Sequence, residues 1–284
     1  MLITARYKFL LLTMLIGGPL LAQEELILQH RRDGYAGCQD AHLLANKPGW
    51  NTGGEDGLEA TGNGGEADAK HLLLRFDLSS LPAESRIDSA WIELYLVKRR
   101  TPQSVPKTLA AYRLNRSWSE GSGDDAGGYD GHPAAAGEVC WSHAAFPDVP
   151  WSLPGANGVP QDHAARPEGE RLIDPADPAG RWYGWKVTDL VQEWLSRPDS
   201  NFGLVLREPS VSAGTGILNF ASSQFAADSL RPRLRLLLAS SSPQTIALAL
   251  TASAASGAIS VRWPCRGDAN GNGYAEIADR KSVV

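Results

Sequence analysis

The strongest constraint in this chain is a strict alternation of apolar and polar side chains in short segments between residues 24 and 238. Along residues 90–96, Ala, Ile and two Leu occupy the even positions, whereas Trp, Glu and Tyr occupy the odd ones. Residues 72–76, 204–207 and 233–236 alternate in a similar way. A period of two with one apolar face is typical of half-buried β-strands. Such a face must be buried against another sheet, so we predict an all-β fold, a β-sandwich of the jelly-roll type.

Composition agrees with this fold and excludes some functions. The 284 residues include 29 Gly and 18 Pro, which suit many turns. The formal net charge of −5 argues against nucleic acid as a partner. After the leader described below, no apolar stretch is long enough to span a membrane, so we expect no membrane association of the mature chain.

The N-terminal segment has the features of a secretory signal peptide. Arg6 and Lys8 precede an apolar run over residues 9–16, a Gly-Gly-Pro break follows, and Ala22 is a small residue suited to cleavage. We therefore predict a signal peptide over residues 1–22 and a secreted, extracellular protein. The alternative is an uncleaved membrane anchor.

One segment has helical rather than strand periodicity. We expect a short helix near residues 188–196, with Thr188 as its N-cap and an end at Arg197-Pro198. Its apolar side chains should close one open end of the sandwich; they are Leu190, Val191, Trp194 and Leu195.

The chain has three cysteines, Cys38, Cys140 and Cys265. An odd number allows at most one disulfide within the chain. The pair that we favour is Cys38–Cys140, and the alternative is three unpaired thiols.

Domain boundaries follow from changes in composition. We predict one domain over residues 23–238, a Ser/Pro linker over 239–245, and a separate fragment over 246–284. Within the first domain, residues 119–180 read as a long Pro/Gly-rich loop, and loops of that length are usually functional or poorly ordered.

Eight short motifs, taken in order, resemble the DNRLRE-domain family, also described as carbohydrate-binding module family 96. They are Asp33-Gly34-Tyr35-Ala36-Gly37 with Asp40, Leu73-Leu74-Arg75-Phe76-Asp77-Leu78-Ser79-Ser80-Leu81-Pro82, Ile87-Asp88-Ser89-Ala90, Leu94-Tyr95-Leu96, Trp118-Ser119-Glu120-Gly121, the run from Trp185 to Trp194, Asn201-Phe202-Gly203-Leu204-Val205-Leu206 and Arg231-Pro232-Arg233-Leu234. The resemblance implies a jelly-roll sandwich in a secreted or surface protein. It also implies non-catalytic binding of polysaccharides, acidic ones such as alginate among them. The stretch between Glu120 and Arg181 departs from the family pattern, which puts binding residues there in doubt.

Aromatic side chains can cover the apolar face of a sugar ring, so aromatic residues in or beside loops are the candidate ligand contacts. They are Trp118, Trp141, Trp151, Trp182 and Tyr183. The alternative for each is that it caps the edge of the core. Aromatic residues inside strands, such as Trp91, are poorer candidates. For an acidic sugar, the basic candidates are Lys98, Arg99, Arg100, Lys107 and Arg113.

The sequence lacks the common catalytic motifs, HExxH and GxSxG among them, so we expect no enzymatic activity of its own. Two other functions compete with sugar binding. One is a structural spacer domain of a bacterial-type surface protein, and the other is part of a polysaccharide lyase or hydrolase.

The C-terminal fragment allows two interpretations. A calcium loop of the dockerin type would use oxygen ligands at Asp268, Asn270, Asn272, Tyr274 and Asp279. Alternatively, residues 248–252 and 257–263 resemble the first two strands of a fibronectin type III domain, with a third beginning at Tyr274. Residues 279–284 resemble a peptide encoded by a sequencing adapter, which suggests a truncated frame and a missing C-terminal domain.

Overall fold

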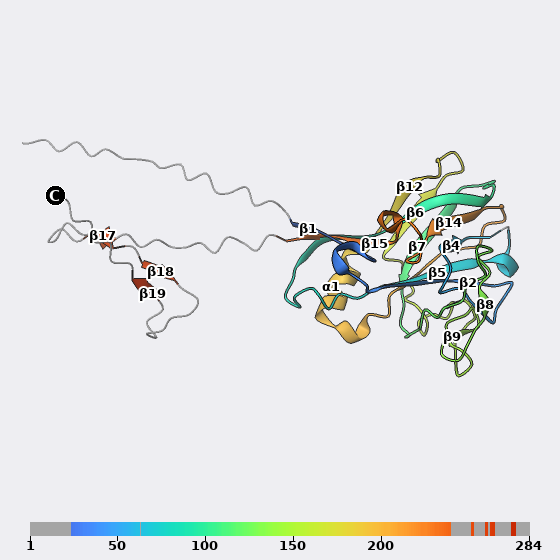
Figure 1. Cartoon of the computed structure of the whole chain (residues 1–284), viewed down its shortest axis with the longest axis horizontal. Helices are drawn as coiled ribbons and strands as arrows, with labels where there is room; N and C mark the ends of the chain where they lie inside the picture. Colours follow the sequence, from blue (N-terminus) through green and yellow to red (C-terminus); the bar gives the residue numbers. More distant parts are fainter. Residues whose placement is uncertain are drawn as a thin grey trace, which may run out of the picture. The chain divides into compact units, whose positions relative to one another are not determined.

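A computed structural model of the chain describes residues 24–62 and 64–239, together with four short strands nearer the C-terminus (Figure 1). By its internal contacts the chain divides into two units, residues 1–239 and 240–284. The predicted signal peptide lies outside the described residues. In the part of the chain that the structure describes, no helix has the length and apolar character needed to cross a membrane.

The first unit is built from two antiparallel sheets. The first sheet has the order β1 (Glu24–Gln29), β15 (Arg233–Leu238), β6 (Ile87–Thr101), β14 (Ile217–Ala221) and β4 (Gly57–Ala60), and β12 (Arg181–Lys186) also pairs with β6. The second sheet has the order β11 (Gly169–Ile173), β7 (Lys107–Arg113), β13 (Leu204–Arg207), β5 (Lys70–Phe76) and β2 (Cys38–Leu44). Two small pairs lie outside these sheets, β3 (Trp50–Asn51) with β8 (His132–Pro133), and β9 (His143–Ala145) with β10 (Val149–Pro150). The described part of the first unit also has four single-turn 3-10 helices, η1 (Arg32–Gly34), η2 (Glu66–Asp68), η3 (Pro198–Ser200) and η4 (Asp228–Leu230). The prediction of an all-β, antiparallel fold is confirmed.

The alternating segments build the core between the two sheets. The even residues of β6, from Ala90 to Leu96, are fully buried there, as are Leu72, Leu74 and Phe76 of β5. The odd residues of β6 lie on the opposite face of the first sheet, as their parity predicts.

The helix α1 (Thr188–Ser196) forms where predicted, and its four predicted core residues are buried. Its N-cap differs from the prediction. Val187 occupies that position and has no side-chain oxygen to cap the helix; its N–H continues the strand pairing to Ala90 O, at 2.9 Å. The Thr188 hydroxyl accepts the N–H of Ala90 at 3.1 Å, so it completes the sheet instead of capping the helix.

The long stretch predicted as a loop forms a second core on the outer face of the second sheet. We call residues 114–164 the insert; it is closed by a bridge between Leu114 and His163. Buried side chains of the insert, Trp118, Val139, Trp141 and Trp151, pack with outward-facing residues of the sheet, Ala41, Leu43, Leu73 and Val205. Strand β5 is therefore buried on both faces, and the expectation of a half-buried strand is wrong here.

Cys38 and Cys140 are free thiols, so the favoured disulfide is wrong. The physical reason is their position in different cores. Cys38 faces the core between the sheets, whereas Cys140 is buried in the insert, with its Sγ 3.3 Å from the Ser142 hydroxyl.

In the second unit the structure describes two antiparallel pairs. Strand β16 (Thr251–Ala252) pairs with β17 (Ile259–Ser260), and β18 (Arg262–Pro264) pairs with β19 (Tyr274–Glu276). The predicted calcium ligands Asp268, Asn270, Asn272 and Asp279 lie outside the described residues, and Tyr274 is described only as backbone. Both interpretations of this fragment stay predictions.

The packing of the insert predicts that it unfolds together with the sandwich. Trp141 is only 8% exposed and its ring centre lies 4.8 Å from that of His71 on β5. Trp141→Ala should lower the free energy of unfolding by about 3–5 kcal/mol, the usual cost of removing a buried aromatic ring. Urea denaturation measures this. Leu153→Ala, at a side chain that is 55% exposed in the same insert, should change it by less than about 0.5 kcal/mol. Equal effects of the two substitutions would contradict a shared core.

Candidate functional site

Four of the five aromatic residues predicted to contact a sugar are buried. Trp118, Trp141, Trp151 and Tyr183 are at most 8% exposed. The indole N–H of Trp118 donates to Phe202 O at 2.8 Å, and that of Trp151 donates to Cys140 O at 3.0 Å. Their rings therefore offer no free face to a ligand, and these residues take the core-capping role that was the alternative for each. Trp182 alone of the five is partly exposed.

Partly exposed aromatic rings gather instead on the outer face of the first sheet. Trp182 on β12 pairs in register with Tyr95 on β6, and Trp91 lies further along β6. On the other side of β6, strand β15 places Arg235 opposite Trp91 and Arg233 opposite Glu93. We call this surface the aromatic–arginine face; its residues are Trp91, Glu93, Tyr95, Trp182, Arg233 and Arg235.

Each indole on this face is stacked with a guanidinium group. The Cζ of Arg233 lies 3.9 Å from the ring centre of Trp182, and that of Arg235 lies 4.1 Å from the ring centre of Trp91. Such short distances are typical of cation–π contacts. The rings of Tyr95 and Trp182 meet edge to face at 5.5 Å.

A single carboxylate orients both guanidinium groups. Glu93 accepts the Nε–H of Arg233 at 2.6 Å with one oxygen and that of Arg235 at 3.0 Å with the other. Nε carries the hydrogen bond of Arg233 to Glu93. The terminal nitrogens of Arg233 make no hydrogen bond to another described residue. The arrangement therefore holds planar rings and unused N–H donors in fixed positions, which favours binding without reorganisation.

Gly184 is the one residue on this face of β12 without a side chain. It lies opposite Glu93 on β12, between Trp182 and the exposed Lys186. A Cβ on Gly184 would lie 3.4 Å from the Cγ of Glu93, so the side chain of Glu93 packs beside this position. Lys186 in turn lies opposite Trp91, which brings a third cation to the edge of the face.

The sequence contained a signal for this face that the choice of candidates missed. The position of Trp91 inside a strand makes it a poorer candidate in the sequence analysis, yet its side chain is partly exposed. Its odd position, shared with Glu93 and Tyr95, places it on the outer face of β6. Arg233 and Arg235 lie on that same face, on the neighbouring strand β15.

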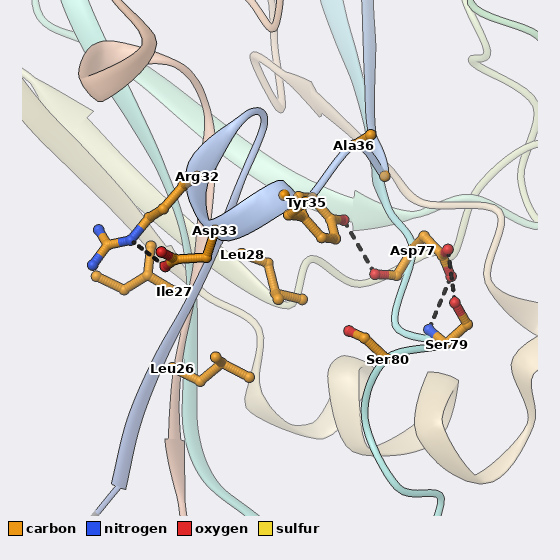
Figure 2. Close-up of a pocket in the computed structure, with 12 residues that line it drawn as sticks. Leu26, Ile27, Leu28, Arg32, Asp33, Tyr35, Ala36, Asp77, Ser79 and Ser80 are labelled. Carbon is orange, nitrogen blue, oxygen red and sulfur yellow. Dashed lines mark hydrogen bonds and ion pairs between the residues drawn. The ribbon is translucent and has the colours of Figure 1, made fainter.

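A cavity of about 600 Å³ lies between β1, η1 and the segment after β5 (Figure 2). Leu26 and Leu28 supply its apolar side, and Tyr35 and Asp77 lie across from them (Figure 2). The Tyr35 hydroxyl donates to Asp77 O at 3.1 Å, while the Asp77 carboxylate accepts the N–H and the hydroxyl of Ser79 at 2.9 and 2.8 Å.

Two of the family-like motifs meet at this cavity. The N–H of Asp77 donates to Gly37 O at 2.8 Å, and a Cβ on Gly37 would lie 2.5 Å from the Cβ of Asp77. Glycine is therefore needed there for the close approach of the two segments. A second hollow of about 390 Å³ shares Gly37 and Asp77 and is lined by Arg75, whose guanidinium donates to Gln39. These motif residues are explained by contacts within the fold.

A pair of carboxylates joins β2 to the insert. Asp40 is 1% exposed, and its N–H donates to Glu120 Oε1 at 2.8 Å. Burial raises the pKa of Asp40 well above its usual range, and the charge of Glu120 raises it further. Burial also raises the pKa of Glu120. Burial closes Asp40 to a substrate, whereas Glu120 is partly exposed.

The basic residues predicted to bind an acidic sugar are engaged within the fold. Lys107 is fully buried and donates to Ser212 at 2.6 Å and Gly214 O at 2.7 Å. Arg100 is bound to Glu59 at 2.7 Å, and Arg113 is bound to both oxygens of Glu193. Lys98 contacts the Tyr129 hydroxyl and Arg99 contacts Asp174 O.

Comparison with models of known protein families gave no match to this chain, and comparison with curated proteins gave none either.

The buried carboxylate pair predicts a pH effect on stability. A carboxyl group whose pKa is raised by folding stabilises the folded state below its unfolded pKa, and that contribution is lost as pH rises through the folded value. The free energy of unfolding of Glu120→Gln, relative to that of the unsubstituted protein, should therefore be higher at pH 8 than at pH 5. Urea unfolding of both proteins at the two pH values measures this, with Asp148→Asn, on the exposed part of the insert, as the control. If Glu120→Gln instead became less stable, relative to the unsubstituted protein, as the pH rises, the raised pKa of Glu120 would be contradicted.

Proposed function

We propose that this chain is a secreted, non-catalytic carbohydrate-binding module of the DNRLRE type, with its two sheets arranged as a jelly roll. In this proposal polysaccharide binds along the aromatic–arginine face. The observation that supports it most is the stacking of Trp182 and Trp91 with Arg233 and Arg235, on a sheet surface where both indoles are partly exposed. The module would direct an attached enzyme or surface protein to its polysaccharide.

The chemistry of the face suits sugar chains. An indole ring covers the apolar C–H face of a pyranose, and the N–H donors of a guanidinium group bind hydroxyl or carboxylate oxygens at its edge. Lys186 and the terminal nitrogens of Arg233 favour uronic acids over neutral sugars. Alginate and pectin are therefore the first polysaccharides to test.

A structural spacer domain is the second candidate function. The burial of Trp118, Trp141 and Trp151 favours it, because these residues now belong to the scaffold. The enzyme alternative has less support, because Asp40, one of the carboxylates whose pKa burial raises, is only 1% exposed. The calcium loop proposed for Asp268 to Asp279 would be a separate cofactor site.

Binding can be measured by affinity gel electrophoresis of the purified chain in gels that contain alginate, pectin or a neutral glucan. We expect alginate or pectin to retard the chain. Trp182→Ala and Arg233→Ala should each weaken that binding about tenfold or more, as is usual for central aromatic and arginine contacts.

The matched control is Leu172→Ala, which removes an exposed apolar side chain from the second sheet. Circular dichroism establishes that each variant is folded. If Leu172→Ala and Trp182→Ala reduced the retardation equally, binding on the aromatic–arginine face would be contradicted. No retardation by any polysaccharide would favour the spacer function.

A further inference from the structure

Two loops of the first unit meet backbone to backbone beside β4. The first runs from β3 to β4 and contains Glu55, and the second, residues 121–131, belongs to the insert. The N–H of Gly54 donates to Gly123 O at 2.9 Å, and the N–H of Gly123 donates to Asn51 Oδ1 at 2.7 Å. A Cβ on Gly123 would overlap the backbone of Asn51. The relative position of the two loops is therefore fixed.

Three carboxylates converge where these loops meet. One oxygen each of Glu55, Asp124 and Asp125 lies within 4.8 Å of the other two. The N–H of Asp125 donates to Glu55 Oε1 at 2.9 Å, and Gly131 donates to the same oxygen at 2.9 Å. The Asp125 carboxylate accepts the N–H groups of Gly128 and Tyr129 at 2.5 and 2.9 Å. All these donors are backbone groups, so they orient the carboxylates without supplying a cationic side chain.

The second observation is the other oxygen of Glu55. Glu55 is only 1% exposed, and its Oε2 is buried with no hydrogen-bond donor among the described residues. A buried carboxylate oxygen without a partner is costly. Glu55 is one of the three residues of the cluster, so a cation held between the carboxylates would supply the missing partner.

Neighbouring acidic residues differ in this respect. Asp130, in the same loop, is paired with Lys47 at 2.9 Å, and Glu59 on β4 is paired with Arg100 at 2.7 Å. Within residues 24–239, no ion pair joins a Lys, Arg or His side chain to Glu55, Asp124 or Asp125. Three carboxyl groups in this space, one of them buried, favour a cation that their oxygens can share.

We propose that Glu55, Asp124 and Asp125 form a calcium site that joins the insert to the loop between β3 and β4. Hard divalent cations bind carboxylate oxygens, which are the only side-chain donors in this cluster. Ca²⁺ accepts six to eight oxygens in flexible geometry, and the exposed side of Asp124 and Asp125 leaves room for water molecules to complete the shell. Bound Ca²⁺ would give Glu55 Oε2 its partner. This site is separate from the aromatic–arginine face and does not depend on sugar binding.

The test uses the full chain with Asp268→Asn in every protein, because Asp268 begins the calcium loop predicted for the C-terminal fragment. Thermal unfolding is followed in EDTA and in CaCl₂, and isothermal titration gives the stoichiometry. In this background we expect one Ca²⁺ per chain and a rise of about 3–10 °C in the Tm of the first unit.

Glu55→Gln keeps an oxygen for the two backbone donors but removes the charge, and it should abolish the rise. Asp124→Asn, at an exposed position where misfolding is not expected, should abolish or strongly reduce it. Asp130→Asn is the matched control from the same loop and should keep it. The proposal is overturned if the background protein shows no rise, or if the rise persists in Glu55→Gln and in Asp124→Asn. An equal rise with MgCl₂ would overturn the assignment to Ca²⁺.

Discussion

The burial of the second sheet on both faces is the constraint on which the rest of this structure depends. Its inner face packs against the first sheet, and its outer face carries the insert, whose tryptophans lie in that second core. Two consequences follow. The tryptophans of the insert are unavailable as ligand platforms, and the outer face of the first sheet, around β6, β12 and β15, becomes the surface where partly exposed aromatic rings occur together.

The alternating pattern was enough to predict β6 and β15 of the first sheet, because each of these strands turns one apolar face to the core. It failed for β5, where Leu72, Leu73 and Leu74 form a continuous apolar run. Such runs are typical of strands buried on both sides. Its partner is the insert, whose Gly- and Pro-rich segments have no periodicity to read. Helix α1 was predictable from its apolar spacing, but its N-cap depended on strand pairing that local sequence does not reveal.

The candidate site was only partly predictable. Parity alone places Trp91, Glu93 and Tyr95 together, whereas the addition of Trp182 and Arg233 requires the register of β12 and β15 on β6. The cluster of Glu55, Asp124 and Asp125 was beyond prediction, because it joins loops about 70 residues apart through backbone contacts. Gly37 and Asp77 illustrate that motif residues can have structural explanations, so a likeness in them bears on the fold and leaves the ligand open.

The central claim is that polysaccharide binds on the aromatic–arginine face. NMR of the indole N–H groups tests it most directly, because the chain has nine tryptophans whose positions differ sharply in burial. During titration with alginate or pectin oligosaccharides, the signals of Trp91 and Trp182 should shift while those of Trp118, Trp141 and Trp151 stay unchanged. Shifts confined to the buried tryptophans, or no indole shift at saturating oligosaccharide, would contradict the account.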